Sequence, residues 1–352
     1  MRRLPIYFLI DVSESMVGEP IQQVEEGMAT IIKALKTDPY AIETVWVSVL
    51  AFAGQAKTVV PLQEIINFYP PRFPIGGGTS LSNGLGHLMY ELRKNQVKTT
   101  HDVKGDWKPI VFLFTDGVPT DDTMNAINEW NQNWRRQTNL VAVSFGDEAD
   151  SHILGQLTEH VLMFKNTDAA AYNEFFKWVT ASIKTSSVSV ENNKSGFELD
   201  KMPGDALSKI DLSKTPERSQ SVDSNFAVLA GKCQNTKRPY LMKYRKVVGP
   251  SSSFADIGLS TRAYRLVGAF QVDQSYFDLS DSSEPKRFTI HTDELIGAPT
   301  CPCCGNQIAF AMCSCGGIHC LGDEEVSTCP WCGNQGRYVA GDGGFDVNRT
   351  QG

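Results

Sequence analysis

The sequence predicts an α/β protein: an open, mostly parallel sheet flanked by helices, followed by a small β-rich, zinc-ribbon-like domain. Two observations predict the sheet. Short and almost continuously apolar runs end at polar or glycine-rich turns, and helical patterns lie between them. The cysteines predict the second domain, because eight of the nine lie between Cys301 and Cys332. Such clustering, in a chain whose N-terminus does not resemble a secretion signal, favours metal binding over disulfides.

The elements of the sheet can be placed along the first half of the chain. Four buried strands are expected from the runs "IYFLIDVS", "TVWVSVLAFAG", "KPIVFLFTDG" and "TNLVAVSFGD". The spacing of apolar residues predicts helices over 20–36, 81–93, 121–135, 150–158 and 168–184. Strands that alternate with helices predict a sheet with helices on both faces. In such sheets, ligands bind outside the carboxyl ends of the strands.

Composition sets the remaining boundaries. Residues 1–187 form the α/β domain, and the polar stretch 188–222 has the composition of a linker. We expect a β-rich C-terminal domain over 223–340, with a zinc-binding module at 300–339 and then a flexible tail at 341–352. The strands of this domain are expected from "PYLMKY", "RAYRLVGAFQV", "SYFDLS" and "RFTIHT".

Charge and hydropathy exclude several classes of function. The formal net charge of −7 argues against general affinity for nucleic acids or membranes. No apolar run is long enough to span a bilayer. The N-terminal "LPIYFLI" is at the short limit for a signal peptide, and Asp11 closes it without a small-residue cleavage site. We therefore expect the first strand of a cytoplasmic protein.

Five oxygen-bearing side chains are predicted to meet at the carboxyl edge of the sheet. Asp11, Ser13 and Ser15 follow the first strand, Thr79 opens the helix after the "GGGTS" loop, and Asp116 ends the "FLFTDG" strand. Oxygen ligands without nitrogen or sulfur suit Mg²⁺ or Mn²⁺. Two carboxylates balance a divalent cation, while the hydroxyls add no charge. The ion therefore stays electrophilic and can accept a carboxylate or phosphate from outside.

These residues resemble a known family. The pattern DxSxS after strand one, a Gly-Gly-Thr loop and a TDG strand end is similar to the von Willebrand factor A (VWA) domain, and the resemblance covers about 1–187. It implies a Rossmann-like fold and a metal-ion-dependent adhesion site formed by Asp11, Ser13, Ser15, Thr79 and Asp116. The resemblance also implies that an acidic residue of a partner protein completes the coordination of the ion.

A catalytic alternative centres on Asp11. An aspartate after a buried strand can be the nucleophile of a haloacid-dehalogenase-like phosphatase, but that chemistry needs a second aspartate where this chain has Ser13. A phosphate-binding loop would need a lysine that "GGGTS" lacks. The sequence therefore favours a binding protein over an enzyme, with a metal-dependent phosphohydrolase as the alternative.

The second candidate site is built from sulfur. "CPCCG" and "CPWCG" are two copies of a CPxCG turn, in which Cys301 and Cys304, and later Cys329 and Cys332, present pairs of thiolates. Two such turns are the pattern of a zinc ribbon with a Cys₄ site. The glycine after each pair allows a left-handed backbone conformation.

The segment between the two turns offers further ligands. Four side chains there suit a second zinc ion: Cys313, Cys315, His319 and Cys320. The alternative is one zinc ion, with the middle cysteines buried as small apolar residues. Spacing does not decide which cysteines pair, because ligand pairs can interleave across two ions. Cys303 is expected to be a spacer, and Cys233 is either a buried thiol or a distant ligand.

A nucleic-acid-binding alternative depends on one basic cluster. Within 300–340 the only basic residue is Arg337, so the zinc module lacks the cations that phosphate contacts require. Basic and aromatic residues do interleave just before it: Lys232, Lys237, Arg238, Tyr240, Lys243, Tyr244, Arg245 and Lys246. The cluster is either a solvated hairpin face or a docking patch for a partner. An acidic or phosphorylated partner is favoured over RNA.

The combination of the two ends is similar to the TerY-like proteins of bacteria. Their C-terminal metal-binding domain has CPxCG units that flank a CxCG segment, which this chain matches from Cys301 to Cys332. The resemblance implies a role in tellurite resistance and stress responses. It also implies partners, since TerY-like proteins are encoded with a protein kinase and a metal-dependent protein phosphatase. We therefore expect an adaptor in a kinase–phosphatase signalling complex.

Overall fold

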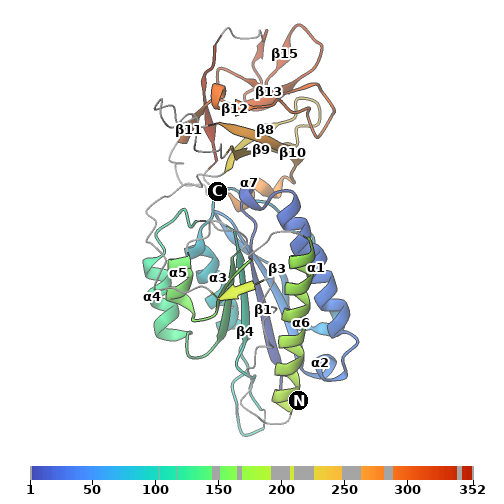
Figure 1. Ribbon diagram of the computed structural model, residues 1–352, viewed down its shortest axis with the longest axis vertical. Helices are drawn as coiled ribbons and strands as arrows, with labels where there is room; N and C mark the ends of the chain where they lie inside the picture. Colours follow the sequence, from blue (N-terminus) through green and yellow to red (C-terminus); the bar gives the residue numbers. More distant parts are fainter. Residues whose placement is uncertain are drawn as a thin grey trace, which may run out of the picture.

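Figure 1 shows the computed structural model of the chain, with the two domains stacked along its long axis. The structure describes residues 2–102, 104–116, 118–144, 151–164, 169–191, 207–209, 226–247, 263–280, 288–338 and 343–350. The VWA-like domain lies at the N-terminal end of the colour scale, and the β-rich domain packs on one end of its sheet.

The first domain is built on a seven-stranded sheet in the order β3-β2-β1-β4-β5-β6-β7. Its strands are β1 (Leu4–Asp11), β2 (Val45–Phe52), β3 (Ala56–Glu64), β4 (Ile110–Thr115), β5 (Asn139–Ser144), β6 (Val161–Phe164) and β7 (Leu207–Lys209). The five central strands pair in parallel. The edge strands β3 and β7 are antiparallel to their neighbours. The open, mostly parallel sheet predicted from the sequence is confirmed.

Helices cover both faces of this sheet (Figure 1). They are α1 (Glu19–Leu35), α2 (Pro39–Thr44), α3 (Leu81–Asn95), α4 (Met124–Asn133), α5 (Ser151–Leu157) and α6 (Ala169–Glu191). Strand β1 shows why two cores form, because alternate side chains point to opposite faces of a strand. Ile6 and Phe8 join the core with α1 and α6, whereas Tyr7 and Leu9 join the core with α3 and α4.

The predicted linker contributes to the first domain. Helix α6 continues to Glu191, beyond the boundary expected at 187, and strand β7 from within 188–222 pairs with β6. Most of the remaining linker lies outside the described residues. The sequence analysis also did not predict strands β3 and β6. Pro61 of β3 lies in an edge strand at a register shift, where a sheet tolerates proline.

The second domain contains a six-stranded sheet in the order β12-β10-β9-β8-β14-β13. Its strands are β8 (Phe226–Lys232), β9 (Pro239–Lys246), β10 (Tyr264–Gln271), β12 (Leu295–Ile296), β13 (Ile308–Met312) and β14 (Ile318–Leu321). Two small antiparallel pairs accompany it, β11 (Phe288–His291) with β17 (Asp346–Arg349) and β15 (Ser327–Thr328) with β16 (Gln335–Gly336). Cys233, Cys301 and Cys320 belong to its core.

Two segments of the second domain differ from expectation. "SYFDLS" was expected to be a strand, but residues Ser275–Leu279 form the short helix α7, because Tyr276 and Leu279, three positions apart, are both buried on one side. The tail was expected to be flexible, but within it β17 pairs with β11 and Val347 is buried in the domain core.

Within the described ranges, no helix combines the length and apolar composition needed to cross a bilayer.

Candidate metal centres

The first candidate site lies where the strand order of the first sheet reverses. From β1 the chain moves outward to β2 and β3, and β4 then pairs on the other side of β1. Ligands of open α/β sheets bind at such a switch point, outside the carboxyl ends of the strands. Asp11 ends β1 and Asp116 follows β4, so the two predicted carboxylates lie on adjacent strands at this position.

Hydrogen bonds link four of the predicted oxygen ligands in a chain that runs from Asp11 through Ser13 and Ser15 to Asp116. The Ser13 and Ser15 hydroxyl oxygens are 3.0 Å apart, and Ser15 donates to Asp116 Oδ1 at 2.7 Å. Asp11 accepts from the Ser13 backbone N–H at 2.9 Å and from the Thr115 hydroxyl at 2.6 Å. The structure therefore brings the DxSxS and TDG segments together as the sequence analysis expected.

Thr79 is held at the same edge by its backbone. Its N–H donates to the Thr120 hydroxyl at 3.0 Å, and its carbonyl accepts from the Thr120 N–H at 2.9 Å. Its side-chain oxygen is buried and has no hydrogen-bond partner in the described part of the chain. Because a buried hydroxyl without a partner is costly, this atom fits a metal ligand. Mg²⁺ or Mn²⁺ suits the resulting set of oxygens.

The electrostatics of Asp11 also fit a cation. The residue is fully buried, and this burial raises the pKa of its carboxyl to about 6, against the lowering effect of its hydrogen bonds from Thr115 and Ser13. A divalent cation would favour the ionised carboxylate and offset the cost of its burial.

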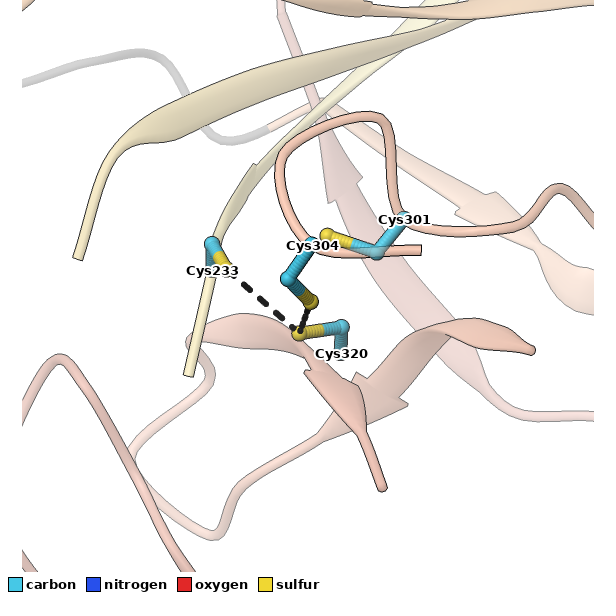
Figure 2. A group of neighbouring side chains, drawn as sticks. All are labelled: Cys233, Cys301, Cys304 and Cys320. Atoms are coloured by element: carbon cyan, nitrogen blue, oxygen red, sulfur yellow. Dashed lines mark hydrogen bonds between the residues drawn. The ribbon is translucent and has the colours of Figure 1, made fainter. Parts of the chain in front are cut away.

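The cysteines form two separate groups. Figure 2 shows the first, in which Cys233, Cys301, Cys304 and Cys320 point toward a common centre from three parts of the chain. Cys320 Sγ lies 3.8 Å from Cys304 Sγ and 3.9 Å from Cys233 Sγ. The second group consists of Cys313, Cys315, Cys329 and Cys332, with Sγ–Sγ distances of 3.7 Å and 3.8 Å.

These distances suit zinc. With Zn–S bonds of about 2.3 Å, the sulfur atoms of a tetrahedral site lie about 3.8 Å apart, whereas sulfurs of a disulfide are about 2 Å apart. None of the nine cysteines forms a disulfide. In the two CPxCG turns, Gly305 and Gly333 have φ angles of 80° and 77°. Their N–H groups donate to the carbonyls of Cys301 and Cys329, each at 2.9 Å, so the two turns have the same geometry.

The cysteine groups answer two questions that the spacing left open, and they differ from the sequence analysis at one residue, His319. The two CPxCG turns do not share one Cys₄ site, since each combines with a different pair of cysteines. Cys233 belongs to the first group, although its position far from the others left its role open. His319 belongs to neither group, because its ring contacts the Cys320 carbonyl at 3.0 Å and the Tyr338 hydroxyl at 2.8 Å.

Cys303, expected to be a spacer, likewise lies outside both groups. Its sulfur contacts the Pro239 carbonyl at 3.9 Å.

The basic cluster of residues 232–246 is not a continuous surface. Tyr240 and Tyr244 are buried in the domain core, so they cannot stack on bases. Lys243 is also buried, with 3% of its surface exposed, and it donates hydrogen bonds to the first domain. The exposed cations lie at opposite ends of the hairpin, with Lys237 and Arg238 at its turn and Arg245 near the far end of β9. This separation does not favour the nucleic-acid-binding alternative.

Comparison with known families agrees with this organisation. Residues 6–178 match the von Willebrand factor type A domain, and residues 223–352 match the TerY-C metal binding domain. The chain is therefore a VWA-domain protein with a C-terminal metal binding domain. This pair of domains, a VWA domain followed by TerY-C, places it among the TerY-like proteins.

Curated relatives resemble this chain at low identity. Inter alpha-trypsin inhibitor heavy chain 4 of Mus musculus is 26% identical over 251 residues, which are 65% of this chain and 24% of that protein. Heavy chain H1 of Mesocricetus auratus is 27% identical over 155 residues, which are 42% of this chain and 17% of that protein. The chain thus spans about a quarter or less of the length of these relatives.

Solved structures show weaker likeness. The von Willebrand factor type A protein from Catenulispora acidiphila has a TM-score of 0.39 at 16% identity, covering 51% of this chain and 42% of that one. Proximal thread matrix protein 1 from the mussel byssus, solved with a zinc-occupied metal-ion-dependent adhesion site, has a TM-score of 0.37 at 18% identity. That match covers 53% of this chain and 46% of the mussel protein.

Proposed function

We propose that this protein is a metal-dependent adaptor that binds an acidic group of a partner protein through a Mg²⁺ or Mn²⁺ ion in the VWA domain. One observation carries the proposal: the unpartnered, buried hydroxyl of Thr79 lies at the sheet edge that also bears Asp11, Ser13, Ser15 and Asp116. An ion held by two carboxylates and neutral hydroxyls keeps enough positive charge to attract an external carboxylate.

The two cysteine groups support a structural role for the second domain. Four thiolates saturate a tetrahedral zinc ion and leave no open position for a substrate. The first zinc would hold segments that are distant in sequence, as Cys233 and Cys320 illustrate, and the second would join residues 313–315 to residues 329–332. Both ions would make the small domain rigid. We expect this rigid domain to be a second contact surface within the complex.

Binding rather than catalysis is favoured by the environment of Asp11. Its two carboxylate oxygens accept hydrogen bonds from Ser13 and Thr115, and the side chain has no exposed surface. A phosphohydrolase would need this carboxylate free to attack a phosphorus atom. The arrangement therefore suits a metal ligand better than a nucleophile.

The partners we propose are the protein kinase and the metal-dependent protein phosphatase that the TerY-like resemblance implies, in a signalling complex linked to tellurite resistance or stress. The test is capture of these two purified proteins on the immobilised chain. We expect capture in Mg²⁺, and its loss in the Asp116→Ala variant.

The control is Asp122→Ala, which removes an exposed carboxylate a few residues further along the chain. This variant should bind as the wild type does. A chelator such as EDTA would remove the zinc ions together with the ion of the VWA domain. The comparison of the two variants instead tests the effect of the VWA ion alone. Equal capture by Asp116→Ala and wild type would contradict the proposal.

A further inference from the structure

The second domain contacts the loops that carry the VWA metal ligands. Helix α7 and strand β9 lie against the carboxyl edge of the first sheet (Figure 1). The contact is partly apolar, since Tyr276 and Leu279 of α7 join the core formed around α1. It is also polar. The hydrogen bonds between the domains involve residues 14–17 and Gly77, and the Gln55 N–H also donates to the Leu279 carbonyl at 2.7 Å.

Glu14 is the centre of these contacts. It lies between the two serines of the DxSxS segment, and only 1% of its surface is exposed. Its carboxylate accepts from the Tyr276 hydroxyl at 2.7 Å and from the Gly78 N–H at 2.9 Å. Gly78 directly precedes Thr79. Glu14 thus connects the loop bearing Ser13 and Ser15 with the loop bearing Thr79, and Tyr276 holds it from the other domain.

Lys243 fixes the same loop from strand β9. Its ammonium group donates to the backbone carbonyl of Ser15, a predicted metal ligand, and to that of Val17 at 3.2 Å. The adjoining loop is held as well, because the Gly77 N–H donates to the Ser280 hydroxyl at 2.9 Å. A buried lysine and a buried glutamate are expensive, so their hydrogen bonds must be kept for the interface to be stable.

Two glycines permit this close approach. A Cβ atom on Gly76 would lie 2.5 Å from Leu279 Cβ and 2.8 Å from Ala53 Cβ. A Cβ atom on Gly18, whose φ is +91°, would lie 2.8 Å from Phe270 Cζ. The first-domain loops therefore have the small residues that contact with α7 and β10 requires.

Helix α7 is also connected to the second cysteine group. Phe277 packs edge-on against Trp331, with ring centroids 5.9 Å apart. Trp331 lies inside the CPWCG turn, and its backbone N–H donates to Cys329 Sγ at 3.4 Å. The orientation of α7 thus depends on the fold of a zinc-binding turn.

We propose that Tyr276 and Lys243 are positioning residues for the VWA metal ion, through which the TerY-C domain sets the affinity of the site. By holding Glu14 and the Ser15 carbonyl, they keep the ligand loops in the arrangement that binds the ion. The inference rests on the proposed metal binding of the VWA domain, and it adds control of that site by the second domain.

The test measures Mg²⁺ and Mn²⁺ affinity by titration calorimetry on the full chain. Tyr276→Phe removes only the hydroxyl that contacts Glu14, and we expect an affinity loss of about tenfold, the scale of one hydrogen bond to a charged group. Lys243→Met should weaken binding in the same direction. The matched control is Tyr244→Phe, whose hydroxyl donates at 3.3 Å to the Gly297 carbonyl within the second domain. It should bind as the wild type does.

A second readout separates positioning from general damage to the fold. Zinc content should be unchanged in Tyr276→Phe, and in a Glu14→Gln background the same substitution should have a smaller effect, since the two residues act together. Wild-type affinity in both Tyr276→Phe and Lys243→Met would overturn the inference and leave the proposed function standing. Absence of Mg²⁺ and Mn²⁺ binding by the wild-type chain would overturn both.

Discussion

Asp11 shows how one residue balances burial against charge. Its side chain is fully buried, yet a metal ligand must be ionised. Burial raises the pKa of this carboxyl to about 6 in the metal-free protein. The folded state then holds the proton more tightly than the unfolded chain. The contribution of Asp11 to stability is therefore present below about pH 4 and is lost as the pH rises through about 6.

A pH dependence of metal stabilisation follows from this shift. Because the ion binds only the ionised carboxylate, Mg²⁺ should raise the melting temperature more at about pH 7.5 than at about pH 5. Thermal unfolding with and without Mg²⁺ at the two pH values measures the difference. The Asp11→Asn variant, which cannot titrate, should show no Mg²⁺ effect at either pH. An equal shift of the wild type at both values would contradict the expectation.

Cys233 and Cys303 provide a matched pair for the zinc sites. Of these two residues, only Cys233 belongs to a group of four thiols. Cys233→Ser should therefore lower the zinc content from two ions per chain to one after dialysis against a weak chelator, because three ligands hold zinc less tightly than four. Cys303→Ser should retain both ions. Elemental analysis of the purified variants gives the counts, and two zinc ions in Cys233→Ser would exclude it as a ligand.

Which side chains lie close together was predictable where the spacing is local. The DxSxS pattern and the CPxCG turns are short, so their chemistry is visible in a few consecutive residues. Cys233 is a different case, since it lies 87 positions from its neighbour Cys320. It reaches the group because strand β8 pairs with β14, a pairing that no local pattern indicates. His319 was misassigned because its side chain contacts Tyr338 instead of pointing into the cluster.

At the scale of elements, the long buried strands of the first domain were predictable, whereas the edge strands β3 and β7 and the four-residue inner strand β6 were not. Strands β1 and β4 are covered on both faces, so their apolar runs are continuous. Strand β3 lies at the edge of the sheet, and its mixed composition with Pro61 weakens the strand pattern. Helix α7 was predicted as a strand because its aromatic residues suit either structure. The contact with the first domain decides whether this segment is a helix or a strand. That contact cannot be deduced from a sequence of five residues.

At the scale of the whole molecule, one hydrophobic core of the first domain, the one around α1 and β1, continues into the second domain. Val228, Leu241, Val272 and Leu279 of the second domain belong to the same cluster as the residues of α1 and β1. Separating the domains would expose these side chains to water, at a cost that grows with the apolar area uncovered. We therefore expect the candidate metal sites of the two domains to belong to one cooperative structure.

This shared core predicts the unfolding behaviour of the chain. Differential scanning calorimetry of the zinc-loaded protein should show one transition that includes both domains. Leu279→Ala removes a buried side chain from the interface and should cost about 2–4 kcal/mol. Because the loss falls on the contact between domains, the variant should show two separate transitions. Ile308→Ala, at an exposed position of the second domain, should keep the single transition of the wild type. Two transitions in the wild type would mean that the domains unfold independently.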